Sequence, residues 1–308
     1  MRKNINLLLL LLILSTLRLF GQETKVEVSA ERKSDNSVEI KYSKNDPGTL
    51  TFQIKFNNLS NSSPTGSNFQ AKGYGGNLLT LRPTNKDQSI SYSYNYRFIR
   101  GKLNPKVNFE FIYGFPLSEN VDVRVSEAGY LNAKYFGNKE PEDWKSYYFH
   151  TKNEENVLAA RKGLVVEVVD GQEDIGENVS FTSKNNKVIV EQEDGTLATY
   201  GVLKSGSIVV KVGDVVFPKD VIAKNSKRSD NLYSFSFNII YLKVADLFIN
   251  EGMNVANTQS YYGFLTPKFL VNAGTQTLEN NSTYQGVWNE EIIVKEMSKK
   301  ELKKYTGK

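Results

Sequence analysis

The chain has 308 residues, with 39 lysines and arginines against 34 aspartates and glutamates, one histidine and no cysteine. This length predicts two domains. The missing cysteines exclude a disulfide framework and a thiol nucleophile, and the single histidine excludes any site within one copy that needs two imidazole groups.

The first 21 residues have the pattern of a secretory signal peptide. Arg2 and Lys3 form a basic head, and a mostly apolar run follows from Leu7 to Leu17. That run is shorter than the roughly 20 residues of a membrane-spanning helix. Residues 1–21 therefore predict export to the periplasm, to the cell surface or out of the cell, and we expect no transmembrane segment in the mature chain.

Removal of residues 1–21 changes the partners that the charge favours. The formal net charge falls from +5 to +2, because this segment holds three basic residues and no acidic ones. Nucleic-acid binding then loses its main support, since it depends on clustered lysine and arginine. Four lysines remain clustered in residues 299–304, and we interpret them as part of a solvated helix with a capping box between Ser298 and Glu301. The alternative is attraction of this cluster to an anionic wall polymer or lipid headgroup.

Alternation of apolar and polar residues predicts strands in residues 22–145, which we interpret as an N-terminal β-domain. The clearest strand has the sequence SISYSYNYRFI and carries an aromatic row on one face, formed by Tyr92, Tyr94, Tyr96 and Phe98. We favour a place in the core for this row over a sugar-binding platform, because residues 50–56 and 107–111 supply further alternating strands to pack against it. The polar residues 57–77 are expected to form a long exposed loop.

Residues 146–245 contain a series of strand and turn signals that we assign to a second domain. An apolar strand is expected at residues 164–169, and a hairpin at residues 187–203 with its turn at Asp194 and Gly195. A further strand is expected at residues 207–212, followed by a turn and a short return. The last strand of the series has the sequence SFSFNII.

Three segments of this domain resemble a known family in their order and spacing: AARKGLVVEV, EQEDGTLATYGVL and VVKVGDVVFPKDVIA. The family is that of the LytM/lysostaphin-type peptidoglycan endopeptidases, the M-twenty-three metallopeptidases. The regions on either side also resemble those of peptidase-like proteins from Bacteroidetes-type bacteria. The resemblance implies an antiparallel β-sheet core with a groove, in which the enzymes of the family hold zinc through histidine and aspartate.

The metal ligands of that family are replaced in this sequence. Its members usually have a His-x-Asp-Gly turn, then Tyr-Ala-His-Leu, and later His-Leu-His-Phe. Gln192, Val202, Ser234 and Ser236 stand at the corresponding histidine positions. A catalytic zinc needs about three protein ligands, which a valine cannot supply and a neutral hydroxyl supplies poorly. The resemblance therefore implies a degenerate member with no catalytic residues and no cofactor.

The two remaining ligands of the family, a histidine and an aspartate four residues apart, have one weak counterpart in His150 and Glu154. Glu154 stands only four residues before Leu158, too close for the usual loop, so we favour a surface histidine beside a solvated glutamate. An all-carboxylate site, or one shared between copies, would suit magnesium or calcium better than zinc. A serine nucleophile with His150 as its base is not supported, because the sequence has no Gly-x-Ser-x-Gly turn.

The resemblance places five residues near the former groove, and these are our candidate ligand residues: Tyr200, Val202, Tyr233, Ser234 and Ser236. Aromatic side chains suit stacking on sugar rings or on peptide. Packing of Tyr200 within the sheet is nevertheless the simpler interpretation of that residue.

The sequence predicts a mainly β protein: an N-terminal β-sandwich-like domain, a LytM-type antiparallel β-sheet core domain, and an extension at residues 246–308 with short strands and a basic tail. We expect a non-catalytic envelope protein that binds peptidoglycan or regulates a wall hydrolase. One alternative is an active zinc metalloendopeptidase that cleaves peptidoglycan cross-links. Another is a surface adhesin or structural envelope component built from β-domains.

Overall fold

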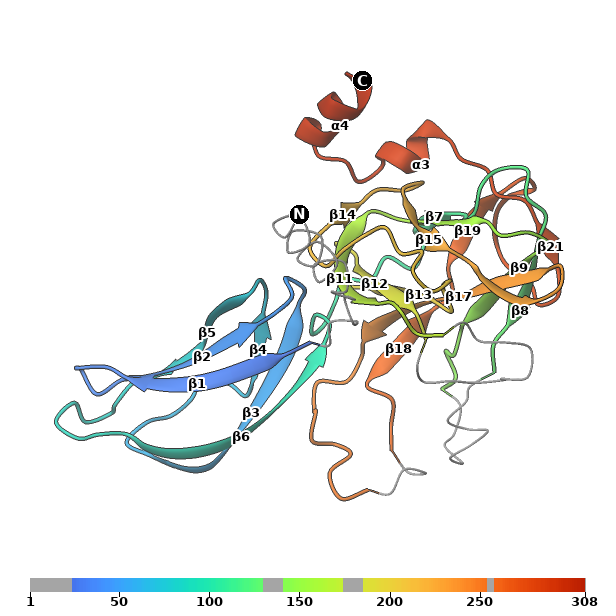
Figure 1. Ribbon diagram of the computed structural model, residues 1–308. Coiled ribbons are helices and arrows are strands. Elements are labelled where there is room, and N and C mark those ends of the chain that lie inside the picture. The colour runs from blue at the N-terminus through green and yellow to red at the C-terminus, as the bar shows by residue number, and fades with distance from the viewer. Residues whose placement is uncertain (1–23, 130–140, 174–184, 254–257, 308) are drawn as a thin grey trace, which may run out of the picture.

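The structure, a computed structural model, describes residues 24–129, 141–173, 185–253 and 258–307. It is mainly β, which confirms the predicted fold class. The strands form two lobes that lie side by side (Figure 1). The predicted signal peptide lies outside the described residues. Within them, no helix is long and apolar enough to cross a membrane.

The N-terminal lobe contains two antiparallel sheets of three strands. The first sheet has the order β1 (Val26–Arg32), β2 (Val38–Lys44), β5 (Gly75–Leu81), and the second has the order β4 (Asn68–Ala71), β3 (Leu50–Ser60), β6 (Ser91–Arg100). Alternate side chains of β2 and β3 point into one shared core, because successive residues of a strand face opposite sides. Its most deeply buried members are Val38, Ile40, Leu50, Phe52, Ile54, Ala71, Leu81 and Ile90.

Two predictions for this lobe and the segment after it are wrong in detail. Residues 57–77, predicted as a loop, contain the end of β3, all of β4 and the start of β5. Residues 107–111, predicted as a strand, form no strand, and a hydrogen bond from Phe111 N to Asn108 O closes a turn there at 3.2 Å. Both differences depend on whether a neighbouring strand is present. Strand β4 pairs with β3, whereas residues 107–111 pair with no strand among the described residues.

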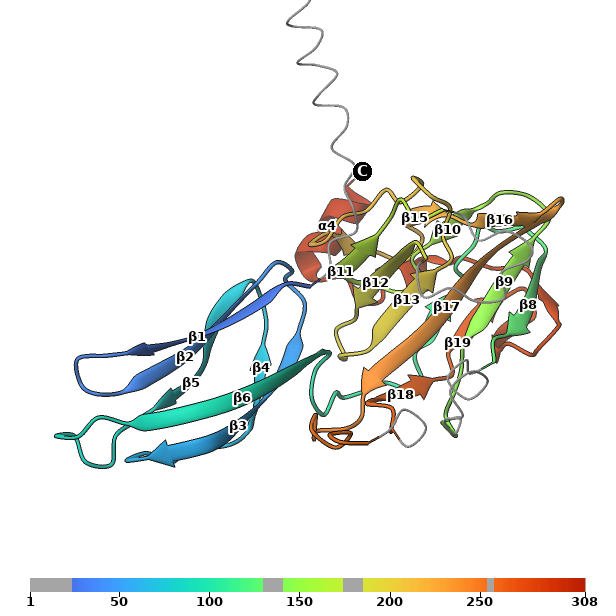
Figure 2. The same cartoon turned by 60° about the horizontal axis from the view of Figure 1, so that its bottom comes forward.

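The C-terminal lobe is organised by a ten-stranded sheet (Figure 2). Its main path runs β14 (Val215–Val216), β11 (Gly163–Val169), β12 (Lys187–Glu191), β13 (Leu197–Gly201), β17 (Leu232–Leu242), β9 (Tyr147–Thr151), β8 (Val123–Glu127), β21 (Thr283–Tyr284). Two further strands, β16 (Ser226–Ser229) and β18 (Tyr262–Leu265), also pair with the long strand β17. All ten are antiparallel to their neighbours.

Two small sheets and two helices complete this lobe. One sheet pairs β10 (Asn156–Leu158) with β15 (Val221–Lys224), and the other has the order β20 (Gly274–Thr277), β19 (Lys268–Val271), β7 (Ile112–Gly114). The helices are α3 (Glu290–Val294) and α4 (Lys299–Thr306). Helix α4 begins with the predicted capping box between Ser298 and Glu301, which is confirmed.

Aromatic rings fill the core between these sheets. Phe149 of β9 stacks on Phe235 of β17 with centroids 5.0 Å apart, and Phe269 of β19 packs against Phe149 and Phe237 at 6.0 and 5.8 Å. These rings bury large apolar areas in specific orientations. The core therefore holds β17 in a fixed register, with Phe235 and Phe237 inward and the alternating Ser234 and Ser236 on the opposite face.

The large sheet crosses both boundaries that the sequence suggested. The predicted division near residue 145 falls between β8 and β9, which pair with each other. Strands β18 and β21, from the predicted extension at residues 246–308, pair with β17 and β8. One further expectation is wrong: residues 207–212 form no strand, although Val209 N donates to Ile222 O at 2.9 Å.

Candidate functional site

The hairpin at residues 187–203 forms as predicted. Strands β12 and β13 pair antiparallel, and the turn closes with a hydrogen bond from Gly195 N to Gln192 O at 3.0 Å. Gly195 has a positive φ of 90°, a conformation that glycine adopts without steric cost. A side chain there would also meet Pro105, because an added Cβ would lie 2.8 Å from its ring.

Gln192, which the sequence resemblance aligns with a histidine, is buried and has a structural role. Its Oε1 atom accepts hydrogen bonds from Thr196 Oγ1 at 2.6 Å, from Tyr113 OH at 3.2 Å and from Arg161 Nη1 at 3.3 Å. Only 2% of the residue is exposed. Gln192 therefore belongs to an internal polar network.

Arg161 is the centre of that network, and the sequence analysis did not identify it. Its guanidinium binds Asp194 Oδ2 at 2.8 Å and Glu296 Oε1 at 2.7 Å, and it lies 3.7 Å from the centroid of the Phe111 ring. Burial alone would lower the pKa of Arg161, but the bonds to Glu296 and the charge of Asp194 raise it overall. Burial likewise favours a higher pKa for Asp194, and Arg161 lowers it overall. Both residues are therefore ionised at neutral pH.

Tyr200 lies in the core and is not accessible to a ligand. It is completely buried, its hydroxyl accepts a hydrogen bond from Ala160 N at 2.8 Å, and its ring meets Phe237 edge to face at 5.0 Å. Burial raises the pKa of this hydroxyl. Val202, two residues later, is also buried and has a φ of +56°, which is uncommon for a β-branched residue. Its N–H donates to Asn185 Oδ1 at 3.2 Å.

The two serines of β17 lie on the sheet face opposite the aromatic core. Ser236 is directly opposite Gly201 of β13, where an added Cβ would lie 2.7 Å from Ser236 Oγ, so only a small side chain fits between them. Ser234 is buried and lies opposite His150 of β9. Tyr233 is half-buried opposite Thr151. The structure thus brings Ser234, Ser236 and the end of β13 together, but separates them from the ring of Tyr200.

His150 is half-buried, contrary to the surface position that we favoured. Its Nε2 atom is 2.8 Å from Ser126 Oγ, and its Nδ1 atom has no hydrogen-bond partner among the described residues. Burial, together with the charges of Arg124 and Arg228, lowers the pKa of the imidazole from 6.5 to about 4. The ring is therefore neutral at pH 7.

Glu154 is engaged elsewhere. Its carboxylate forms ion pairs with Lys204 and, at 2.7 Å, with Lys224, and the bonds to these lysines lower its pKa. It shares no partner with His150. Within the described ranges, no group of three or more His, Cys, Asp or Glu side chains could hold a metal ion. Two hydroxyls and one neutral imidazole, from Ser234, Ser236 and His150, are not a donor set that fits a catalytic zinc site.

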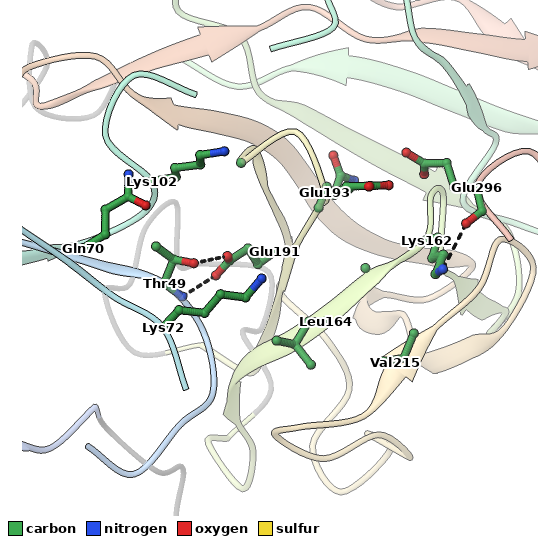
Figure 3. A pocket seen from close by; sticks show the side chains of 13 residues that line it. Thr49, Gln70, Lys72, Lys102, Lys162, Leu164, Glu191, Glu193, Val215 and Glu296 are labelled. Atoms are coloured by element: carbon green, nitrogen blue, oxygen red, sulfur yellow. Dashed lines mark hydrogen bonds between the residues drawn. The ribbon is translucent and has the colours of Figure 1, made fainter. Parts of the chain in front are cut away.

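A separate pocket of about 450 Å³ opens where the two lobes meet (Figure 3). Its wall is formed by Thr49, Gln70, Lys72, Lys102, Lys162, Gly163, Leu164, Glu191, Gln192, Glu193, Gly195, Val215 and Glu296. These residues come from both lobes and from the C-terminal tail, so no local motif could have indicated the pocket. Clefts between lobes are common places for ligands to bind.

The charged groups of this interlobe pocket come from both lobes, and two of them form hydrogen bonds to other residues of its wall. Glu191 accepts hydrogen bonds from the backbone N–H of Thr49 at 2.6 Å and from its hydroxyl, and these bonds join the lobes (Figure 3). Lys162 donates to Glu296 O at 2.9 Å. Lys72 and Lys102 come from the N-terminal lobe and the segment that follows it, and Glu193 comes from the β12–β13 turn. The pocket thus combines cationic and anionic groups.

Comparison with known proteins adds no relative: no family model matches this chain, and no curated protein matches it significantly.

Proposed function

We propose that this chain is a non-catalytic, LytM-like protein of the cell envelope that binds peptidoglycan or regulates a wall hydrolase. One observation carries the proposal. Strands β13 and β17 pair so that Gly201, which precedes Val202, lies opposite Ser236. The sequence resemblance assigns imidazoles to the positions of Val202 and Ser236, and this chain has methyl and hydroxyl groups there. A sheet of this kind can keep its shape while its ability to hold zinc is lost.

The contacts of His150 and Glu154, the two weak candidates for metal ligands, also favour a non-catalytic protein over an active endopeptidase. His150 is bonded to Ser126, and Glu154 is neutralised by two lysines. Zinc binding would have to break these contacts and recruit further ligands, since three protein ligands are typical of a catalytic site. Binding without cleavage needs neither step.

The interlobe pocket is the place where a wall fragment would bind. The peptide stems of peptidoglycan carry carboxylate and amino groups, and the wall of the pocket contains the cationic Lys72 and Lys102 as well as the anionic Glu193. Complementary charges of this kind fix the orientation of a bound ligand. Its volume of about 450 Å³ is in the range of ligand-binding clefts.

Sedimentation with purified peptidoglycan sacculi tests this proposal. The mature protein is expected to sediment with sacculi and to release no soluble fragments, with or without added zinc. The double variant Lys72→Glu/Lys102→Glu should bind several-fold more weakly. Lys106→Glu makes one such charge reversal, half of the change in the double variant, on an exposed residue outside the pocket wall and should bind normally.

Two results would contradict the proposal. Fragment release that a chelator abolishes, together with about one zinc per chain in elemental analysis, would establish the endopeptidase instead. Failure to bind sacculi and failure to crosslink to any envelope protein would remove the binding role. Labelling of this protein on the surface of intact cells, without either kind of binding, would favour the adhesin alternative.

A further inference from the structure

Strand β6 forms an open edge of the N-terminal lobe (Figures 1 and 2). It has ten residues and pairs with β3 on one side, and no described strand pairs with its other side. Proteins usually blunt such edges with proline, bulges or inward-pointing charges. The sequence of β6, SYSYNYRFIR, has no proline, and its register against β3 is continuous from Phe56 to Leu50.

The hydrogen-bond pattern shows which backbone groups of β6 face outward. Gly101 N donates to Thr49 O at 2.9 Å, so Gly101 and, by alternation, Ile99 and Arg97 turn their backbone groups toward β3. The N–H and C=O groups of the residues between them face away from the sheet. Arg100 O is one of these outward groups, and it accepts a hydrogen bond from Tyr262 OH at 2.7 Å.

The remaining outward groups belong to Tyr94, Tyr96 and Phe98, whose side chains are also incompletely covered. Tyr94 is half-buried, whereas Tyr96 and Phe98 are 37% and 41% exposed, so the core position expected for the aromatic row is wrong for these two. Tyr96 lies opposite the buried Ile54 of β3, and Phe98 lies opposite the buried Phe52. The ring of Phe52 contacts both, at 6.3 Å from Tyr96 and 5.6 Å from Phe98. The aromatic row therefore continues the core layer out to the open edge.

A pocket of about 230 Å³ adjoins this edge. Its wall contains Tyr96, Arg97, Phe98 and Ile99 of β6, together with Leu247 and Tyr261 of the C-terminal lobe. An open strand edge beside a side-chain pocket is the arrangement by which extended peptides add a strand to a sheet, because the backbone supplies affinity and the pocket supplies selectivity.

The charges near the edge favour one kind of occupant. Lys55 and Arg97 have side chains that are 61% and 38% exposed, and both share the single carboxylate of Glu251, at 3.9 and 3.6 Å. An acidic side chain on an incoming segment would complement these two exposed cations, whose contacts with Glu251 are long for ion pairs. A second copy of β6 would not, since its only charged residues are arginines.

We propose that the edge of β6 binds an extended, acidic segment of a partner protein, which adds a strand along Tyr94, Tyr96 and Phe98 and places an apolar side chain in the adjoining pocket. This interaction is independent of the proposed binding of wall fragments in the interlobe pocket. It requires no rearrangement of the lobe, because the outward backbone groups are already aligned in a regular strand.

The test uses the mature protein and a synthetic, fluorescently labelled decapeptide of alternating valine and glutamate. Fluorescence anisotropy should show saturable binding, and amide hydrogen exchange of Tyr94, Tyr96 and Phe98 should slow when the peptide is bound. A peptide with the same side chains but N-methylated alternate amides should bind at least about tenfold more weakly, because it lacks the donors that a sheet needs. The double variant Tyr96→Thr/Phe98→Thr should lose affinity similarly, whereas Tyr74→Thr, at another exposed aromatic residue of the lobe, should not.

Three results would overturn the proposal. Equal binding of the two peptides would show that the backbone edge is not used. Absence of both binding and exchange protection at millimolar peptide would show that the edge does not accept a strand. A concentration-dependent dimer that Tyr96→Thr/Phe98→Thr abolishes would identify a second copy as the occupant in place of a partner protein. Circular dichroism of the double variant confirms that it is folded.

Discussion

Arg161 donates a hydrogen bond from Nη1 to Oδ2 of Asp194 at 2.8 Å, and this ion pair joins the segment before β11 to the turn between β12 and β13. The same arginine binds Glu296, so the C-terminal tail is held against the turn. Arg161 is 3% exposed. Charges buried this deeply are tolerated only when they are paired, and removal of one partner leaves the others uncompensated.

We therefore expect Arg161→Met to lower the free energy of unfolding by about 3–5 kcal/mol, because Asp194 and Glu296 would lose their shared cation. Urea unfolding at neutral pH measures this loss. As a control, Asp230→Asn removes one partner of the exposed ion pair with Lys227 and should leave the free energy of unfolding nearly unchanged. Equal losses in the two variants would contradict the central role of Arg161.

The single histidine permits a direct test of its environment. Because the chain contains no other histidine, the imidazole resonances in an NMR titration belong to His150 without mutagenesis. Burial beside Arg124 and Arg228 should give a pKa of about 4, well below the ordinary 6.5. A measured pKa near 6.5 would show that the ring is exposed to solvent and that Ser126 does not hold it.

The same pKa shift predicts how stability depends on pH. Between pH 4 and 6.5 the unfolded chain binds the proton of His150 more readily than the folded chain, so the free energy of unfolding should rise with pH across this window and level off above it. The contribution is about 3 kcal/mol. Urea unfolding at pH 5 and pH 7 should show a steeper rise for the wild type than for His150→Asn, and equal slopes would contradict the assignment.

Tyr200→Phe distinguishes a core role from a ligand role. The variant removes the acceptor of the Ala160 N–H, which would stay buried without a partner, so the free energy of unfolding should fall by about 1–3 kcal/mol. Binding to sacculi by the folded variant should not change. Tyr233→Phe, at a half-buried residue, should alter stability by no more than about 0.5 kcal/mol. Loss of binding to sacculi without loss of stability would instead support a ligand role for Tyr200.

The contact between the lobes depends on a residue without a side chain. A Cβ at Gly48 would lie 2.5 Å from Val166 Cγ1, closer than atoms can pack, so Gly48→Ala should destabilise the protein by about 1–3 kcal/mol. It should also shift the NMR resonance of the Thr49 amide, which bonds to Glu191. Gly66→Ala, whose Cβ would meet nothing within 4 Å, is the matched control and should change neither. Similar behaviour of the two variants would show that the lobes are loosely joined.

Local sequence patterns predicted the elements that need only their own neighbours. The β12–β13 hairpin was predicted because Asp194 and Gly195 form a turn between two alternating strands, and both strands pair as expected. The capping box of α4 was predicted for the same reason, since its two hydrogen bonds lie within four residues. Neither prediction needed knowledge of distant contacts.

Predictions that depended on distant partners were less successful. Residues 207–212 have a strand-like composition, yet they form no strand. Tyr96 and Phe98 have the spacing of core residues, but β6 is an edge strand and the layer that would cover them is incomplete. Spacing along a strand indicates which residues share a face, but it does not indicate how much of that face another layer covers.

The sequence by itself determined the mainly β class and the turns, because residue type and spacing are local properties. The same local patterns are the basis of our proposal that Gln192, Val202, Ser234 and Ser236 stand at histidine positions of a family. Only the tertiary structure decided that Tyr200 is buried, that Arg161 joins three segments, and that Lys72, Lys102 and Glu193 meet in one pocket. The physical reason is that burial and ion pairing depend on which distant segments pack together. In this protein a ten-stranded sheet, built from strands within residues 123–284, brings distant segments of the chain together.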